Sequence, residues 1–339
     1  MKKLYLKDIA KNLQVSQTTV SLVLNKKGDE NKISQETQKR IIEYAKEHRY
    51  VANQLARGLS RGKSETIGLI IPDISDTFYA NIAGTIETKA MEMGYTVVFS
   101  SSYENPEKEK ALIYSMLNRQ VDGLILASTQ KNSEEIITLQ KNNFPVVLID
   151  RHYPEIETNY VLVDNFGGIY KACSHLIGLG RKKIGFVTIK SELEAMRQRF
   201  LGYKKAVEDS SQIDQELCLR ELDYKKYGTD MKEAIQEMVR EGADSLVFST
   251  HYLTREGIRA LNDLGMKVPG QIAIVSFSDM SAFDLIDPPI TSVVQPVGDI
   301  GKTALAILFD EMKVGTISTE LDKKRILETK FVIRKSCGS

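Results

Sequence analysis

The chain has 339 residues, of which 42% are hydrophobic, and its length and composition are those of a globular protein of two or three domains rather than a disordered one. The formal net charge of +1 is unevenly distributed: residues 1–63 carry 14 Lys and Arg against 6 Asp and Glu, and the remainder carries 32 against 39. A small basic module on an acidic body indicates a polyanionic partner for the module.

The cysteine pattern argues against two kinds of stabilising site. The three cysteines are widely spaced and odd in number, which indicates neither a disulfide framework nor a zinc site: Cys173, Cys218 and Cys337.

Residues 1–20 lack the apolar core of a signal peptide, and no run approaches the ~18 apolar residues that span a membrane. We therefore expect a cytoplasmic protein with reduced thiols and no membrane contact.

The first predicted elements are two short helices within "DIAKNLQVSQTTVSLVLN", residues 8–25. Their apolar positions form one buried face on each helix, and the hydroxyl of Ser16 can cap the second helix after a tight corner. The outward positions of the second helix carry mostly short hydrogen-bonding side chains: Gln17, Thr18, Ser21, Leu22 and Asn25. This face is therefore predicted to contact a partner.

A third helix is predicted in "ISQETQKRIIEYAKEHRY", residues 33–50. Ser34 can cap it, and its pattern predicts burial of Ile41, Ile42 and either Tyr44 or Ala45. Three short helices are enough for a small all-α module, which we place at residues 1–52.

From residue 64 onward, short apolar runs alternate with longer amphipathic segments, which is typical of βα units in parallel sheets. The runs are "TIGLIIP" (66–72), "YTVVFS" (95–100), "DGLILAS" (122–128), "PVVLID" (145–150), "KIGFVTI" (183–189), "SLVFST" (245–250) and "IAIVSF" (272–277). They fall into two sets that divide near residue 163, so we predict an α/β core with two doubly wound parallel sheets. A cleft between such lobes, at the C-terminal ends of the strands, binds small ligands.

Two stretches partly match sequence motifs of enzymes, but neither has the context that its motif requires. "GLSRG" (58–62) has the letters of a serine hydrolase elbow without the strand before it, and "GDIGKT" (298–303) has too few residues for a phosphate-binding loop. The histidines lack metal-ligand spacing: His48, His152, His175 and His251. The sequence therefore predicts no catalytic residues, no metal and no cofactor.

Several stretches together resemble the LacI/GalR family of bacterial transcription regulators. They are "DIAKNLQVSQTTVSLVLN", "RYVANQLARGL", "IGLIIPDISDTFYANI", "VDGLILAS", "PVVLIDR", "HLIGLGRKKIGFV", "DPPITSVVQPVGDIGKTA" and "ETKFVIRKS". The resemblance implies a helix-turn-helix module, a hinge segment over residues 53–63 that becomes helical on DNA, and a two-lobed core at 64–339 like that of periplasmic sugar-binding proteins. We expect the first lobe at about 64–162 plus 294–325, and the second at about 163–292 plus 326–339.

The resemblance also implies how the module contacts DNA. The second helix enters the major groove, where Gln17, Thr18 and Leu22 face base edges. Other residues of this helix and its corner are placed for phosphates: Ser16, Thr19, Ser21 and Asn25. Asn53 belongs to the same DNA-binding set, and Ala56 and Leu59 of the hinge lie in the minor groove. Leu22 replaces the usual Arg, which predicts a different operator half-site.

For the cleft, the resemblance implies an effector site for a small carbohydrate, a sugar or sugar acid. The implied residues are Asp76, Phe78, Tyr79, Asp150, Arg197, Arg199, Tyr224, Thr250, Ser278 and Gln295. Aromatic rings beside carboxylate, guanidinium and amide groups suit a polyol, because a ring stacks on its apolar face and polar groups bind its hydroxyls. Thr250-His251 and Ser278 replace residues that are often Asn-Asp and Asp in the family.

These observations predict a LacI-type transcriptional repressor that binds double-stranded operator DNA, a pseudo-palindrome, as a homodimer. The sequence ends at "VIRKSCGS" without the leucine heptads that make some family members tetrameric, which favours a dimer. Two alternatives remain open at this stage. A partner protein could control the same regulator, or the core could be a sugar-binding receptor without DNA function, which would need a signal peptide and no basic module.

Overall fold

The computed structural model describes residues 4–50, 63–211, 216–315 and 322–339. The chain forms two compact units, Met1–Ser64 and Glu65–Ser339. Three of the expected DNA-binding residues lie outside the described residues: Asn53, Ala56 and Leu59.

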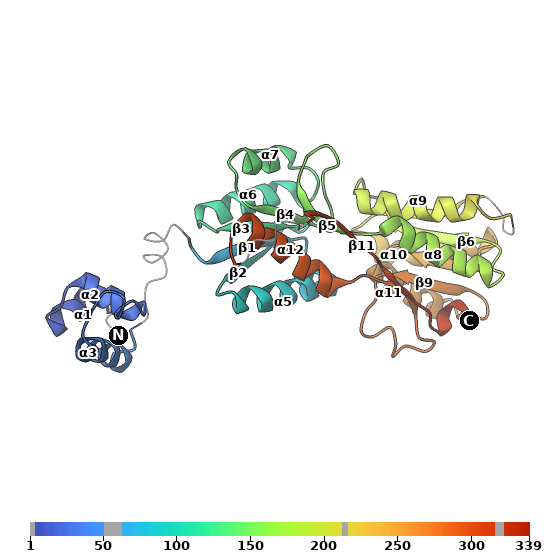
Figure 1. Ribbon diagram of the computed structural model, residues 1–339. Coiled ribbons are helices and arrows are strands. Elements are labelled where there is room, and N and C mark those ends of the chain that lie inside the picture. Colours follow the sequence, from blue (N-terminus) through green and yellow to red (C-terminus); the bar gives the residue numbers. More distant parts are fainter. Residues whose placement is uncertain (1–3, 51–62, 212–215, 316–321) are drawn as a thin grey trace. The chain divides into compact units, whose positions relative to one another are not determined.

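The described part of the N-terminal unit contains three helices, α1 (Leu6–Leu13), α2 (Gln17–Leu24) and α3 (Gln35–Glu47) (Figure 1). Gln14 ends α1 in the left-handed backbone region, with φ of 55°, and turns the chain. Ser16 Oγ accepts a hydrogen bond of 2.9 Å from the backbone N–H of Thr19 and caps α2. The predicted corner between two helices is therefore confirmed.

The core of this unit is formed by six buried residues: Ile9, Ala10, Val20, Val23, Ile41 and Ala45. The predicted burial of Ile42 is wrong, because half of this residue is exposed. Ile41 and Ala45 lie one turn apart on the inner face of α3, and the next position along a helix points about 100° away.

The second unit contains two lobes, and the first is built on a six-stranded sheet in the order β11-β5-β4-β3-β1-β2. All pairs in this sheet are parallel. The strands are β1 (Thr66–Ile71), β2 (Thr96–Ser101), β3 (Gly123–Leu126), β4 (Val146–Ile149), β5 (Asn159–Val163) and β11 (Lys324–Leu327).

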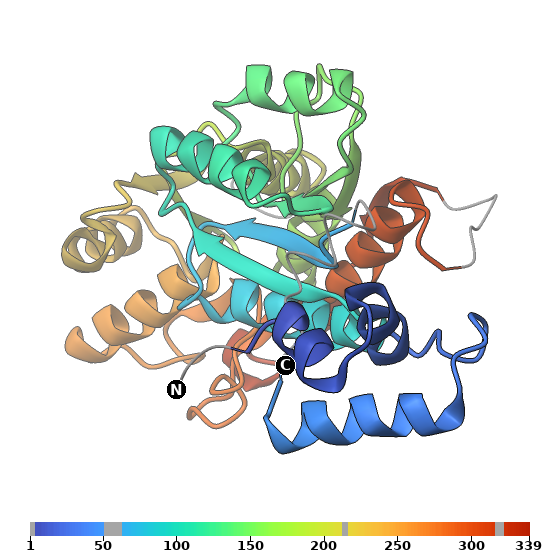
Figure 2. The same ribbon diagram turned by 90° about the vertical axis from the view of Figure 1, so that its left-hand side faces the viewer.

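Helices cover both faces of this sheet because its strands are apolar on both sides. On β1, Leu69 and Ile71 belong to the cluster that includes α5 (Thr77–Glu92) and α12 (Val297–Glu311). Ile70, which points to the opposite face, belongs to the cluster that includes α6 and α7. The helices α6 (Pro106–Asn118) and α7 (Ser133–Lys141) lie above the sheet in both views (Figures 1 and 2).

The second lobe has a six-stranded sheet in the order β12-β10-β9-β8-β6-β7. Its strands are β6 (Ile184–Ile189), β7 (Cys218–Leu222), β8 (Ser245–Phe248), β9 (Ala273–Phe277), β10 (Thr291–Val294) and β12 (Lys330–Val332). Its helices are α8 (Asn165–Gly178), α9 (Glu194–Glu208), α10 (Tyr227–Arg240), α11 (His251–Asp263) and the short η1 (Lys335–Cys337). The expected all-parallel sheet needs one correction, because β12 pairs antiparallel with β10.

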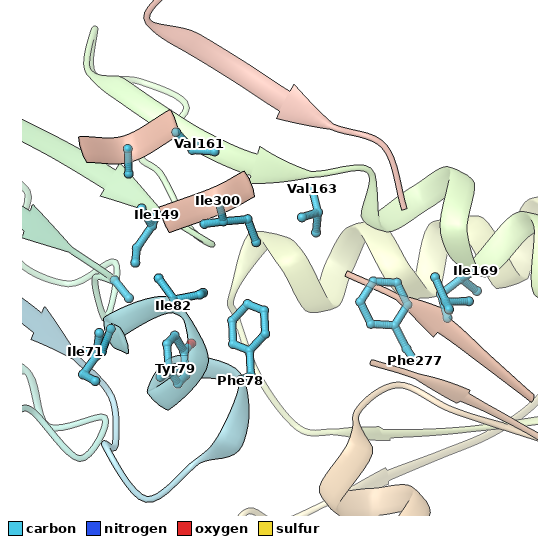
Figure 3. Packing of buried hydrophobic residues seen from close by; sticks show 14 of the residues in the cluster. Ile71, Phe78, Tyr79, Ile82, Ile149, Val161, Val163, Ile169, Phe277 and Ile300 are labelled. Carbon is cyan, nitrogen blue, oxygen red and sulfur yellow. The ribbon is translucent and has the colours of Figure 1, made fainter. Parts of the chain in front are cut away.

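The chain passes between the two lobes at three places: from β5 to α8, from β10 to α12, and from β11 to β12. The reversed direction of β12 follows from these passages, because β10 leaves the second lobe where β12 enters it. One cluster of buried apolar side chains runs through both lobes, from Ile71 and Ile149 through Val163 to Ile169 and Phe277 (Figure 3). The two-sheet α/β core predicted from the sequence is confirmed.

Candidate functional site

The exposed face of α2 is the first candidate site. Gln17 and Thr18 are exposed, and within the described residues their side chains make no hydrogen bond. The neighbouring polar side chains are already paired: Ser16 Oγ lies 2.8 Å from Thr19 Oγ1, and Asn25 Nδ2 donates to the backbone carbonyl of Ser21 at 2.8 Å. Gln17 and Thr18 therefore keep free donors and acceptors, whereas Leu22 adds a partly exposed apolar contact.

The second candidate site is a cavity of about 260 Å³ between the two lobes, here called the first cavity. It lies where loops follow the strands of both sheets, which is the usual ligand position in open α/β folds. Nine of the ten expected effector residues line it: Asp76, Phe78, Tyr79, Asp150, Arg199, Tyr224, Thr250, Ser278 and Gln295. Asp150 and Ser278 both have left-handed backbone, with φ of 63° and 74°.

Arg197 is the exception among the expected residues, because it is not among those that line the first cavity. It lies two positions before Arg199 on α9, so its side chain leaves the opposite side of the helix. Its side chain is 61% exposed and pairs with Glu194, with Nε 2.7 Å from Oε2. The family resemblance implied that both arginines bind the effector, but the helix directs only Arg199 toward the cavity.

Arg199 is almost fully buried and is held by the second lobe. Its Nε donates to Asn165 Oδ1 at 2.8 Å, its Nη1 donates to the carbonyl of Ser249 at 2.7 Å, and its guanidinium lies 3.9 Å from the ring centroid of Phe277. Burial lowers the pKa of Arg199 to about 10. Within the described residues Nη2 makes no hydrogen bond and no carboxylate forms an ion pair with this side chain, so the guanidinium can still bind an acceptor in the cavity.

On the first lobe, four side chains form a polar network. Tyr79 donates its hydroxyl to Asp150 Oδ2 at 2.7 Å, and Arg151 donates to Glu104 through both terminal nitrogens, at 2.8 and 2.6 Å. Burial lowers the pKa of Arg151, but Tyr79, Glu104 and Asp150 outweigh it and hold that pKa well above its usual value. Burial also raises the pKa of Tyr79, so its hydroxyl stays protonated and donates to Asp150.

One pair connects the two lobes across the first cavity. His251 Nε2 lies 3.4 Å from Asp76 Oδ1, and Asp76 also accepts a hydrogen bond of 2.8 Å from the backbone N–H of Phe78. Burial lowers the pKa of His251 despite the nearby carboxylate, and burial raises the pKa of Asp76 despite the nearby imidazole. Burial therefore favours the uncharged form of both groups, and their mutual attraction opposes it.

Several lining residues were not among the expected effector residues: Glu104, Arg151, Tyr227, His251, Tyr252 and Arg255. Arg151 and His251 directly follow Asp150 and Thr250, so their position after a strand was a usable signal. Glu104 gave no such signal, because only the fold brings its loop against Arg151. Gln295, which was expected in the site, has a buried Oε1 that finds no hydrogen-bond partner among the described residues.

In the described parts of the chain, no group of three or more His, Cys, Asp or Glu side chains is arranged to hold a metal ion. None of the described helices combines the length and apolarity that crossing a bilayer requires.

Comparison with known proteins shows the family to which the chain belongs. Residues 5–53 match bacterial regulatory proteins of the lacI family, and residues 173–337 match a periplasmic binding protein-like domain. Catabolite control protein A of Priestia megaterium is 32% identical over 93% of this chain and 94% of its own length. The transcriptional regulator RegA of Clostridium saccharobutylicum is 31% identical over 98% of both chains.

The architecture is also found in a solved structure. The lac repressor dimer, bound in that crystal to operator and an anti-inducer, superposes with a TM-score of 0.84 and 22% identity over 99% of each chain. That likeness concerns the fold, whereas the relatives above 30% identity establish the family. The chain therefore belongs to the lacI family of bacterial regulatory proteins, and it is a DNA-binding transcriptional regulator rather than an enzyme.

Proposed function

We propose that this regulator represses transcription by binding a pseudo-palindromic operator as a homodimer, and that a small sugar or sugar acid in the first cavity controls it. One observation carries the second part of the proposal. Within the described residues, Gln295 Oε1 is buried at the cavity without a hydrogen-bond partner, and an unpaired buried polar group costs about 1–3 kcal/mol, whereas Arg199 adds a nitrogen, Nη2, that makes no hydrogen bond there. A ligand with several hydroxyl groups would satisfy them.

The exposed amide of Gln17 and hydroxyl of Thr18 support DNA reading by α2. A glutamine amide can bind adenine through two hydrogen bonds, and threonine can bond a base or contact a thymine methyl. The net charge of +8 on residues 1–63 supplies the phosphate attraction that any such contact needs. Ser16, Thr19, Ser21 and Asn25 are the proposed phosphate contacts, and Asn53, Ala56 and Leu59 complete the proposed DNA-binding set.

The chemistry of the first cavity supports a polyol ligand. Phe78 and Tyr224 offer ring faces, whereas Asp76, Asp150 and Arg199 offer charged groups for the edge of a sugar ring. Thr250 and Ser278 add hydroxyl groups from the second lobe. Because these groups come from both lobes, the ligand would favour one relative position of the lobes.

Such a preference can be transmitted to DNA. Three chain passages join the lobes, and a ligand that contacts both lobes can shift a hinge-type equilibrium between open and closed states. Coupling between two sites is typically about 1–3 kcal/mol, which is 5- to 150-fold in DNA affinity. The sign of the change distinguishes an induced repressor from a co-repressed one.

The test is to select duplex sites for the full chain from a random pool and then measure operator affinity with ribose, glucose, galactose, gluconate and glucose 6-phosphate. We expect salt-sensitive binding to a two-fold symmetric site and at least one ligand that changes the affinity. Failure to select any duplex would contradict the DNA part. Tight DNA binding that no small molecule alters would contradict the ligand part and favour control by a partner protein.

A further inference from the structure

A second cavity, of about 740 Å³ and partly open to solvent, lies between the two lobes and adjoins the first cavity. Five residues line both cavities: Glu104, Arg151, Met196, Tyr224 and Tyr252. We propose that the second cavity binds the second ring of a disaccharide whose first ring occupies the first cavity. This inference rests on the proposed sugar effector and specifies its size.

The volumes favour a ligand larger than one ring. The first cavity, at about 260 Å³, lies below the range of about 300–1,000 Å³ that is usual for ligand pockets, whereas the second lies within that range. The two share lining side chains, so at most one layer of side chains separates them. A ligand that filled only the first cavity would leave the larger space to water.

Two exposed tyrosines contribute to the aromatic lining of the second cavity, and Lys108 Nζ lies 4.0 Å from the ring centroid of one of them, Tyr103. Tyr103 follows β2 of the first lobe and is 61% exposed, and Tyr224 follows β7 of the second lobe and is 53% exposed. Within the described residues neither hydroxyl makes a hydrogen bond. Aromatic rings of this kind stack on the apolar faces of sugar rings and leave their hydroxyl groups free to bond at the edge.

The loop that carries Tyr103 has a strained backbone. Tyr103 and Glu104 are consecutive residues with φ of 54° and 56°, in the left-handed region that residues other than glycine rarely adopt. The loop is held by a hydrogen bond of 2.7 Å from Tyr103 N to the carbonyl of Pro72 and by the paired bonds between Glu104 and Arg151. Strain of this kind accumulates at ligand sites, and here it places Tyr103 in the second cavity and Glu104 between the two.

Two of the five residues at the boundary between the cavities are adaptable, whereas Glu104 and Arg151 are held by their paired hydrogen bonds. Met196 has a flexible side chain, and Tyr224 is half exposed with no hydrogen bond from its hydroxyl group in the described structure. Rotation of these two side chains would let one ligand extend through both cavities. The rim of the second cavity adds charged hydrogen-bonding groups for the second ring: Lys131, Glu155, Lys190, Asp223 and Lys225.

The experiment titrates the full chain by calorimetry with disaccharides and their constituent monosaccharides. The panel is maltose, cellobiose and trehalose with glucose, lactose and melibiose with galactose, and sucrose with fructose. We expect at least one disaccharide to bind more tightly than either constituent, by about three- to ten-fold or more per added ring contact. Tyr103→Ala should lose this advantage and leave monosaccharide affinity unchanged.

Tyr114→Ala is the matched control, because Tyr114 on α6 is 46% exposed and lines neither cavity. It should bind every sugar as the parent does. If a monosaccharide binds as tightly as every disaccharide, or if Tyr103→Ala weakens both equally, the second ring site is wrong while the proposed sugar effector stands. If no sugar of the panel binds, the second ring site is wrong, and the operator titrations with ribose, gluconate and glucose 6-phosphate show whether the proposed sugar effector stands.

Discussion

The imidazole Nε2 of His251 lies 3.4 Å from Oδ1 of Asp76, and these two residues belong to different lobes. Asp76 caps the N-terminus of α5, and His251 is the first residue of α11. The pair therefore connects the N-terminal ends of two helices across the first cavity. A change in the charge of either residue would therefore alter both the electrostatics of the cavity and the attraction between the lobes.

The first prediction concerns the pH dependence of stability. Because burial lowers the pKa of His251, the unfolded chain takes up a proton near pH 6.5 that the folded chain does not. Stability contributed by this group is therefore present above that pH and decreases as the pH falls. Asp76, whose pKa is raised, acts with the opposite sign at lower pH. In His251→Gln, the thermal midpoint should fall less than in the parent between pH 8 and pH 5.5.

The comparison uses differences between parent and variant, because burial also lowers the pKa of His152 and His175, and both remain in the variant. Thermal unfolding of the full chain, measured every half unit of pH, gives the two slopes. Parallel slopes for parent and variant would show that His251 takes up its proton equally in both states.

The second prediction separates the two arginines of α9. Arg199→Ala should abolish the response of operator affinity to sugar, because this guanidinium lines the first cavity, and should leave DNA binding without ligand unchanged. Arg197→Ala is its control on the same helix, since Arg197 is exposed and does not line the cavity. Titration of each variant with the ligand panel checks this. A normal response in Arg199→Ala would move the ligand elsewhere.

The third prediction concerns the exposed face of α2. Gln17→Ala should cost about 1–3 kcal/mol of binding free energy on the selected operator and should relax the base preference at one position of each half-site. Gln35→Ala removes an exposed glutamine from α3 instead, where its amide bonds to Asp29, and should bind as the parent does. Fluorescence anisotropy with single-base operator variants measures both. A uniform loss across all sequences would indicate that Gln17 contacts phosphate.

The fourth prediction concerns the packing of α8 against α9. A Cβ at Gly202 would lie 2.3 Å from the backbone oxygen of Phe166 and 3.2 Å from the backbone nitrogen of Tyr170, so Gly202→Ala must push the two helices apart. We expect a loss of about 1–3 kcal/mol in the free energy of unfolding. Gly228→Ala on α10 meets no atom within 4 Å and should be neutral or stabilise by up to about 1 kcal/mol. Urea unfolding of both variants decides between these effects.

The sequence predicts features that depend on neighbouring residues. The cap at Ser16 and the corner at Gln14 are local. Six of the seven apolar runs correspond to strands that are buried on both faces, and the seventh corresponds to β2, an edge strand that is only partly buried. The strand β7, with the sequence CLREL, escapes this pattern because Arg220 and Glu221 interrupt its apolar residues at the edge of the sheet. Its charged side chains give no apolar run.

Features that depend on distant residues were harder to predict. Nine of the ten effector residues that the family resemblance implied line the first cavity. The resemblance implied Arg197 as well as Arg199, and only their positions on the helix α9 show that Arg199 faces the cavity and Arg197 does not. The bidentate contact between Glu104 and Arg151 joins loops 47 positions apart. The periodicity of the sequence does not predict a contact between such distant residues.

The three passages between the lobes also affect the order in which the molecule can be completed during synthesis. The first sheet receives β11, and the second receives β12, only when residues 324–332 have been made. The helix α12, which covers the first sheet, likewise follows every strand of the second lobe except β12. Although N-terminal segments usually fold first on the ribosome, the first lobe must therefore wait with an open edge, and with one face covered by α5 alone, until the second lobe has left the exit tunnel.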